Sequence, residues 1–452
     1  MSASLTGLVL LGVASPAALF VVLGVRSLVN RPLTERWTAR LAASALTVAF
    51  TALLTALVAS GATSGSERLL RYGAWSTAYG GGIAIEFLVD RFALAFAALS
   101  AAILGVVSAF SNRYLHREPG YNRYFVLLAM FATGMLLVTL AGNVEVLFVG
   151  WELVGLSSAL LVAFFHERPA SVSNAFRVLS VYRVSDAAML SAAVLLRHLA
   201  GSDSLSLLFS DHAAATAGLT GTQATLIAIL LLVAVAGKSA LLPFSSWLPR
   251  AMEGPTPSSA VYYGALSIHA GCFLLLRAAP IFEQAPAARL LAGALGAATA
   301  LYAAVTTRVQ TDVKSSLAYA SLTQVGIIVV EIALGWHTIA FVHLAGHASF
   351  RLLQFLSAPN VLHDLHGIED ALGNRPSPRI GRMEALVPHP VRRAVFLIAL
   401  ERGFLDSLLE KAVVGPFTRL SHRMERLDRW LCEALLPREQ PAAVAGGDDQ
   451  DE

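Results

Sequence analysis

Long apolar stretches separated by short polar connections recur along the first 360 residues of the chain. A helix needs about 20 mostly apolar residues to cross the hydrocarbon core of a bilayer. Stretches of this kind lie at 4–25, 40–60, 87–110, 122–142, 144–165, 176–199, 223–243, 258–280, 288–306, 315–335 and 338–358. The pattern therefore predicts an all-α, polytopic membrane helix bundle of about eleven transmembrane helices, some of them broken.

The character of the chain changes after residue 358. Residues 359–393 are polar and rich in turn-forming residues, and the apolar run 394–400 is too short to span a bilayer. Apolar residues then recur at helical spacing between charges, which predicts amphipathic helices at the membrane interface or against a partner. We expect N-terminal membrane helices, a membrane core, a cytoplasmic or interfacial amphipathic region and a disordered acidic tail, at 1–84, 85–358, 359–436 and 437–452.

Composition supports an integral membrane protein, because 56% of the residues are hydrophobic and only 14% are charged. Soluble domains carry about a quarter charged residues. Basic residues gather in the connections 26–40, 111–123 and 359–393. The positive-inside rule then places the N-terminus outside the cell and the C-terminus in the cytoplasm.

The sequence lacks the usual signatures of cofactor binding. Its two cysteines, Cys272 and Cys432, do not form a CxxC pair, and it contains neither a GxGxxG loop nor a GxxxxGK[ST] loop. We therefore expect no cofactor and no metal in this chain, no nucleotide hydrolysis and no nucleic-acid partner.

A single lysine interrupts the apolar stretch LLVAVAGKSALLPFSSWLP, residues 231–249. The chain has 33 Lys and Arg residues, of which only Lys238, Lys314 and Lys411 are lysines. A desolvated lysine can lose its proton, whereas an arginine cannot. Pro243 removes a backbone hydrogen bond and predicts a helix break nearby. Lys238 is therefore a candidate proton-binding group, the alternative being a lysine that snorkels to the interface.

Further acidic candidates lie in two neighbouring predicted helices. Glu152 stands in LFVGWELVGLSSALLVAFF, near the start of a helix otherwise free of charge. An intramembrane carboxylate is costly and indicates function, although Glu152 also fits a helix end that faces headgroups. Arg183 and Asp186 are three residues apart and can pair on one helix face. Asp90, which stands next to Arg91, could have a structural role and not a functional one.

Histidines occupy the middle of two later predicted helices. His269 lies about half-way along its helix and suits a proton relay, or is a neutral core residue. His343, His347 and Arg351 follow at intervals of four and share one helix face. Their stripe indicates a hydrated path or a partner-facing seam, or alternatively one polar cluster that holds the fold. Glu331, near a helix end, is interpreted as a surface group.

Four segments within residues 85–360 together resemble one family. They are WELVGLSSALLVAFF, GKSALLPFSSWLPRAMEGPTPSSAV, TDVKSSLAYASLTQVG and FVHLAGHASFRLLQFLS. In this order they resemble the antiporter-like, proton-conducting membrane subunits of respiratory complex I and the Mrp cation/proton antiporters.

The resemblance implies a lateral proton path along the membrane midplane. Glu152 and Lys238 would form the Glu–Lys pair of the family, and His269 stands where many relatives have a central lysine. His343 and His347 match the His pair of the following polar helix. Arg183, Asp186, Arg351 and Pro243 would be supporting residues.

The chain also departs from the family pattern. The helices that carry the family's exit lysine are expected to be missing, since ERGFLDSLLEKAVVGPFTRLSHRMERLDRWL resembles a stretch much further along the large complex I subunit. The smaller number of membrane helices and the segment FLSAPNVLHD are most similar to those of DabB, the membrane subunit of the DAB inorganic-carbon accumulation complex. This implies a large zinc-containing partner of DabA type, resembling a β-carbonic anhydrase.

The DabB resemblance implies a non-enzymatic transport subunit in the bacterial cytoplasmic membrane. Flow of protons or Na⁺ through it would drive CO₂ hydration by the partner. One alternative is a proton-pumping module of a complex I-like or hydrogenase-like redox complex, or of an Mrp-type antiporter. Another is a structural anchor whose buried polar groups only hold the bundle together.

Overall fold

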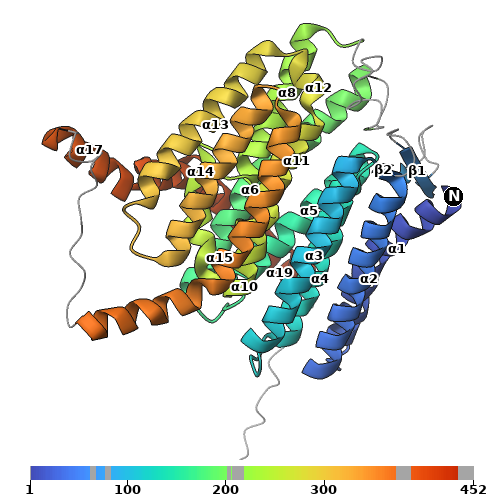
Figure 1. Cartoon of the computed structure of the whole chain (residues 1–452), viewed down its shortest axis with the longest axis horizontal. Coiled ribbons are helices and arrows are strands. Elements are labelled where there is room, and N and C mark those ends of the chain that lie inside the picture. Colours follow the sequence, from blue (N-terminus) through green and yellow to red (C-terminus); the bar gives the residue numbers. More distant parts are fainter. Residues whose placement is uncertain are drawn as a thin grey trace, which may run out of the picture.

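The computed structural model describes residues 2–61, 68–76, 83–200, 205, 218–372 and 388–435. Within these residues, 11 helices are long and apolar enough to cross a membrane. The predicted all-α membrane bundle is therefore confirmed. Figure 1 shows the long helices running alongside one another, with α1 and α2 at one edge of the bundle. The predicted disordered tail, 437–452, lies outside the described residues.

The bundle is built from long helices in chain order. They are α1 (Ser2–Leu28), α2 (Glu35–Gly61), α3 (Arg91–Tyr114), α4 (Tyr121–Leu140), α5 (Val144–Val162), α6 (Pro169–Ala200), α8 (Gly221–Lys238), α11 (Ser267–Arg277), α13 (Pro286–Thr307), α14 (Val313–Ala333) and α15 (His337–Leu372). Most spans are between half and fully buried by their neighbours, whereas α13 buries only 28% of its apolar window. One side of α13 therefore faces outward, toward the lipid of a membrane.

The chain is broken between α8 and α11. Helix α8 ends at Lys238, five residues before Pro243, so the span expected at 223–243 is shorter than predicted. Short helical pieces follow: the 3-10 helix η2 (Phe244–Ser246), α9 (Trp247–Arg250), the 3-10 helix η3 (Ala251–Glu253), α10 (Thr256–Ser259), the π-helix η4 (Ala260–Ala265) and, after α11, α12 (Ala279–Glu283). The indole of Trp247 donates to the carbonyl of Gly237 at 3.0 Å, which satisfies one carbonyl freed at the break.

A two-stranded antiparallel hairpin, which the apolar pattern does not predict, precedes α3. Strand β1 (Arg68–Ser76) pairs with β2 (Ile83–Val89). The carboxylate of Asp90 accepts from the backbone N–H of Ala93 at 2.7 Å and caps α3, so the span expected at 87–110 begins only at Arg91. Because β2 is itself apolar, its residues merge with the helix in a hydropathy pattern. Asp90 also pairs with Arg277, in agreement with its structural interpretation.

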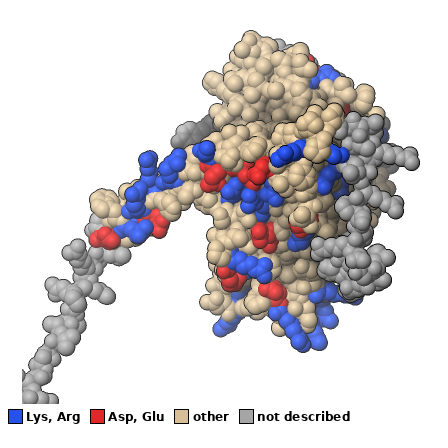
Figure 2. All heavy atoms as spheres, turned by 90° about the vertical axis from the view of Figure 1, so that its left-hand side faces the viewer, with Lys and Arg blue, Asp and Glu red and all other residues tan. Residues whose placement is uncertain are grey.

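Two C-terminal segments differ from the sequence expectation in detail. Helix α15 continues to Leu372, so the first part of the region expected to be turn-rich is helical. After residue 387 come α17 (His389–Leu400), the 3-10 helix η5 (Arg402–Phe404), α18 (Leu405–Leu409), the π-helix η6 (Glu410–Val414) and α19 (Gly415–Leu435). In α19 every side chain from Arg419 to Glu433 is exposed. Figure 2 shows an arm rich in charged side chains projecting from the molecule.

Two glycines allow α4 and α5 to approach closely. A Cβ on Gly150 would lie 2.8 Å from the carbonyl oxygen of Gly134 and from the backbone nitrogen of Val138. A Cβ on Gly134 would lie 2.9 Å from the carbonyl oxygen of Gly150. Backbone atoms cannot rotate out of the way as side-chain ends can, so the contact needs glycine on both helices.

We predict that Gly150→Ala forces α4 and α5 apart and lowers stability by about 1–3 kcal/mol, the usual cost of overpacking. The midpoint of thermal unfolding in a mild detergent measures it. Gly105→Ala in α3 is the matched control, since its Cβ meets nothing within 4 Å, and it should leave the midpoint unchanged or slightly raised. Equal midpoints for the two variants would contradict the close approach.

Candidate functional site

The ammonium group of Lys238 lies fully buried at the end of α8. Its side chain is 0% exposed, and Nζ donates to the carbonyl oxygen of Trp151 at 3.1 Å. Nζ also lies 4.8 Å from the ring centre of Trp151 and 4.4 Å from that of Tyr182. A Cβ on Gly155 would approach Nζ to 2.8 Å. The pocket therefore fits one ammonium group between two aromatic faces, which attract a cation electrostatically.

A buried carboxylate on α6 faces this lysine. Oδ1 of Asp186 lies 4.0 Å from Nζ of Lys238, and the Asp186 side chain is only 5% exposed. Arg183, three residues earlier on α6, forms an ion pair with Asp186, with Nη2 2.8 Å from Oδ2, and donates a hydrogen bond to Oε2 of Glu152 at 2.6 Å. The four side chains form one series, Glu152–Arg183–Asp186–Lys238, with Arg183 between the two carboxylates.

The pair implied by the family resemblance, Glu152 and Lys238, is thus connected through two intermediate residues. Among the described residues, the carboxylate within ion-pair distance of Lys238 belongs to Asp186. Glu152 is 27% exposed and lies at the outer end of the series. The predicted pairing of Arg183 with Asp186 on one helix face is present in the structure. Sequence spacing alone could not place α6 between α5 and α8.

A second group of ionisable side chains joins α11 to α15. Nε2 of His269 and Nδ1 of His347 lie 2.9 Å apart, a hydrogen-bond distance between two buried imidazoles. Nε2 of His347 accepts from Nε of Arg351 at 3.2 Å, and Nη1 of Arg351 donates to Gln354 at 2.5 Å. Because Arg351 donates to Nε2, a neutral His347 carries its proton on Nδ1 and donates to His269.

His343 extends this group toward α14. Its Nδ1 lies 2.9 Å from Oε1 of Glu331, and its Nε2 lies 3.1 Å from Oε1 of Gln324. The rings of His343 and His347 are 6.3 Å apart between centres. Glu331 is 14% exposed, so its interpretation as a surface group is wrong. The sequence signal that could have revealed it is a lone carboxylate in an apolar helix, directly before the histidine-bearing one.

Buried hydroxyl groups lie close to Lys238 and on the segment that leads to His269. Ser267 lies two residues before His269 and close to Tyr182, whose ring contacts Lys238. Within the described residues, the hydroxyls of Tyr182, Ser267 and Tyr262 are buried without a protein partner. Ser239, directly after Lys238, donates to the carbonyl oxygen of Ile268 at 2.6 Å and fixes α8 against α11. Buried polar groups without protein partners are the usual sites of internal water.

An ion-pair network attaches the C-terminal segment next to the broken helix. Oδ2 of Asp406 in α18 accepts from Arg250 of α9 at 2.7 Å and lies 3.7 Å from Arg402. Arg177 of α6 donates to Glu410 at 2.6 Å and lies 3.9 Å from Asp406. The segment that carries α19 is therefore bound to α6, which also carries Asp186, and to α9, one of the short pieces that follow Lys238. None of these residues was predicted from the sequence.

No group of three or more His, Cys, Asp or Glu side chains suited to a metal ion occurs within the described part of the chain. The candidate site consists of proton-binding groups, hydrogen-bond donors and hydroxyls on α5, α6, α8, α11, α14 and α15. Arginine does not release its proton, so Arg183 and Arg351 can set the local potential and position their neighbours. Lysine, carboxylate and imidazole groups can exchange protons.

Comparison with known proteins identifies the family. Residues 141–400, more than half of the chain, match the model of the NADH:quinone oxidoreductase/Mrp antiporter transmembrane family. The chain belongs to this family. Residues 75–125 also match the model for the N-terminus of chain 5 of complex I NADH-ubiquinone oxidoreductase. The predicted membership of the complex I and Mrp family is confirmed.

Individual family members match over most of this chain. NADH-ubiquinone oxidoreductase chain 5 of Allomyces macrogynus is 34% identical over 66% of this chain and 46% of its own length. NADH-quinone oxidoreductase subunit L of Mycobacterium tuberculosis is 31% identical over 78% of this chain and 55% of its own. A chain in the structure of the Mrp complex from Dietzia sp. DQ12-45-1b is 29% identical, with a TM-score of 0.67, over 83% of this chain and 39% of its own.

The chain spans about half the length of the two sequence relatives. The matched region of the family model runs from the start of α5 to the end of α17 and so contains Glu152, Lys238 and His269. It includes all the elements that carry the candidate site.

We predict that Asp186→Leu lowers stability by about 3 kcal/mol, because it leaves the buried ammonium of Lys238 without its charge partner. Adding Lys238→Met to this variant should restore most of the loss, since neither charge then remains. Thermal unfolding of both variants measures the effect, with the exposed Glu167→Gln as control. A double variant as unstable as the single one would contradict the pairing.

Proposed function

We propose that this chain conducts protons along the series from Glu152 to Lys238 and on to the histidine group. Titratable groups inside a membrane are rare because a charge there is costly, and they mark ion pathways and proton relays. Here they lie on six helices, with hydrogen bonds between Glu152 and Arg183 and between His269 and His347, and with buried hydroxyls near Lys238 that can bind water. The observation that carries the proposal is the fully buried Lys238, 4.0 Å from Asp186.

Proton transfer would proceed in short steps between neighbours. Lys238 can release a proton because desolvation destabilises its charged form, and Asp186 can receive one. Water held by Tyr182 and Ser267 would carry a proton toward His269. His269 and His347 would pass it on along their 2.9 Å contact, and His343 with Glu331 would continue the route. Each step needs a local change of charge and no large movement of the helices.

We further propose that proton flow drives a large zinc-containing partner of DabA type, which hydrates CO₂. The proposal rests on the similarity to DabB of the segment FLSAPNVLHD and of the smaller number of membrane helices. The C-terminal segment supports it, since α19 is exposed and its base is held on the broken helix through Arg250 and Asp406. A partner on α19 could therefore exert force on α9, the element that follows Lys238. The chain itself would be a transport subunit, with zinc chemistry confined to the partner.

A second candidate function follows from the relatives. The M. tuberculosis relative is a subunit of NADH-quinone oxidoreductase, and the Dietzia chain belongs to an Mrp complex. This chain would then conduct protons within a redox-driven pump or a cation/proton antiporter of several subunits. The proton path would be the same in both cases, but the energy source and the partner subunits would differ.

Replacing Lys238 tests the conducting role. We predict that Lys238→Ala abolishes inorganic-carbon uptake in cells while the complex still assembles, because the central exchangeable group of the path is lost. Uptake of labelled bicarbonate and the yield of purified complex measure the two effects. Lys411→Ala, an exposed lysine in η6, is the matched control and should retain uptake. Full uptake by Lys238→Ala would show that the buried groups only hold the fold.

Purification of the tagged chain in a mild detergent tests the partner. We predict one large partner with stoichiometric zinc by mass spectrometry and metal analysis. Recovery of several subunits with iron and flavin would instead assign the chain to a redox pump. Several membrane subunits without metal would assign it to an Mrp-type antiporter, and either result would contradict the CO₂ proposal.

A further inference from the structure

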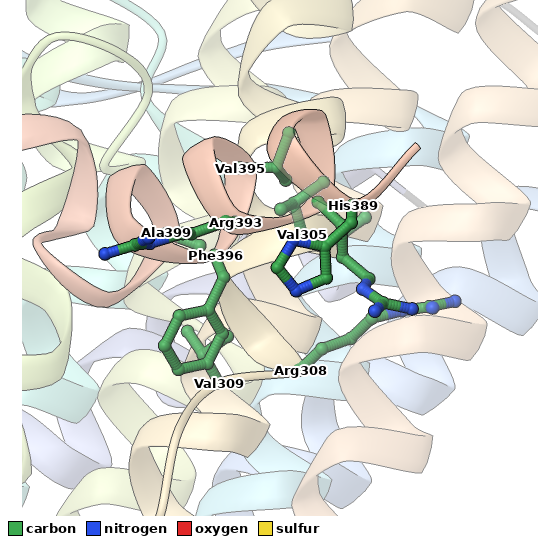
Figure 3. A pocket seen from close by; sticks show the side chains of 10 residues that line it. Val305, Arg308, Val309, His389, Arg393, Val395, Phe396 and Ala399 are labelled. Atoms are coloured by element: carbon green, nitrogen blue, oxygen red, sulfur yellow. The ribbon is translucent and has the colours of Figure 1, made fainter. Parts of the chain in front are cut away.

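A groove of about 610 Å³ lies between the C-terminal end of α13 and helix α17. Ala304, Val305 and Val309 form one wall, and Val395, Phe396 and Ala399 form the other. Figure 3 shows Val305 and Val309 facing Phe396 and Ala399 across the groove. Its volume falls within the range of small-molecule sites in proteins. The two walls of the groove are formed mostly by apolar side chains.

Basic side chains occupy the rim of this apolar groove. Arg308, His389, Arg392 and Arg393 line it, and no acidic residue does. In Figure 3 Arg308 and His389 lie on one side, and Arg393 extends to the opposite side beyond Phe396. Within the described residues, neither Arg392 nor Arg393 has a carboxylate within ion-pair distance. The groove therefore presents positive charge beside an apolar surface.

The position of the groove indicates which molecules reach it. Helix α13 is the least buried of the candidate spans, at 28%, and Leu301 on it is 69% exposed. On α17 the side chains of Phe396 and Ile398 are 50% and 51% exposed. An outward-facing apolar surface on a spanning helix borders the lipid phase. A molecule that enters the groove from this side therefore comes from the lipid phase.

We propose that the groove binds an anionic phospholipid, such as phosphatidylglycerol. Its phosphate would lie beside Arg392 and Arg393, and the first part of an acyl chain would lie against Val305 and Phe396. Basic pockets beside membrane helices bind anionic headgroups by charge attraction, and arginine matches a phosphate with paired donors. The lipid would fasten α17 to α13 and so stabilise the base of the C-terminal segment. This site is separate from the proton path.

Lipid titration of the purified complex tests the proposal. Native mass spectrometry gives the affinities for phosphatidylglycerol and for zwitterionic phosphatidylcholine. We expect Arg392→Gln/Arg393→Gln to weaken phosphatidylglycerol binding by roughly tenfold or more and to leave phosphatidylcholine unaffected. The matched control is Arg423→Gln/Arg426→Gln on α19, which removes the same charge from an exposed helix and should retain binding.

Two further measurements distinguish a lipid site from other anion sites. Ala304→Phe fills the groove and leaves every arginine in place, so it should also weaken phosphatidylglycerol binding. Glycerol phosphate, which has the phosphate but no acyl chains, should fail to displace the lipid at equal concentration. Equal affinity for both lipids, equal loss in the α19 control, or full displacement by glycerol phosphate would each overturn the proposal. Arg393 is exposed and Arg392 half-buried, so we expect their replacement to leave the fold intact.

Discussion

The burial of one ammonium group constrains the centre of this molecule. Removing a charged lysine from water costs several kcal/mol unless other groups compensate. Here the compensation comes from the Asp186 carboxylate, the Trp151 carbonyl and two aromatic faces, contributed by α5 and α6. Ending α8 at Lys238 places the ammonium where these groups converge. The break after α8 and the packing of α8 against α5 and α6 thus both contribute to compensating the buried ammonium group.

The same break connects the charged centre to the outer part of the molecule. Short helical pieces replace a continuous helix after Lys238, and one of them carries Arg250, which pairs with Asp406 of the C-terminal segment. Arg177, on the helix that carries Asp186, pairs with Glu410 of that segment. A force on the C-terminal segment would therefore act on α6, which carries Asp186, and on α9, which lies in the broken stretch after Lys238. This arrangement is suited to coupling between ion movement and a partner.

The sequence was most informative for features that depend only on the order of residues along the chain. Runs of about 20 apolar residues identified the spans, and the rarity of lysine identified Lys238. Contacts between helices could not be read in this way, so Arg183 as the link between Glu152 and Asp186 emerged only from the structure. The same holds for Glu331, whose partner His343 lies on the next helix. The hairpin was missed because strand β2 is as apolar as the helix it precedes.

Proton flux through the purified complex in liposomes tests the central claim most directly. A potassium diffusion potential would drive protons inward, and a trapped pH-sensitive dye would report the change. We predict a flux in the wild-type complex that Lys238→Ala eliminates and that persists in Lys411→Ala. Equal flux in wild type and Lys238→Ala would contradict it, because protons would then pass without the buried lysine.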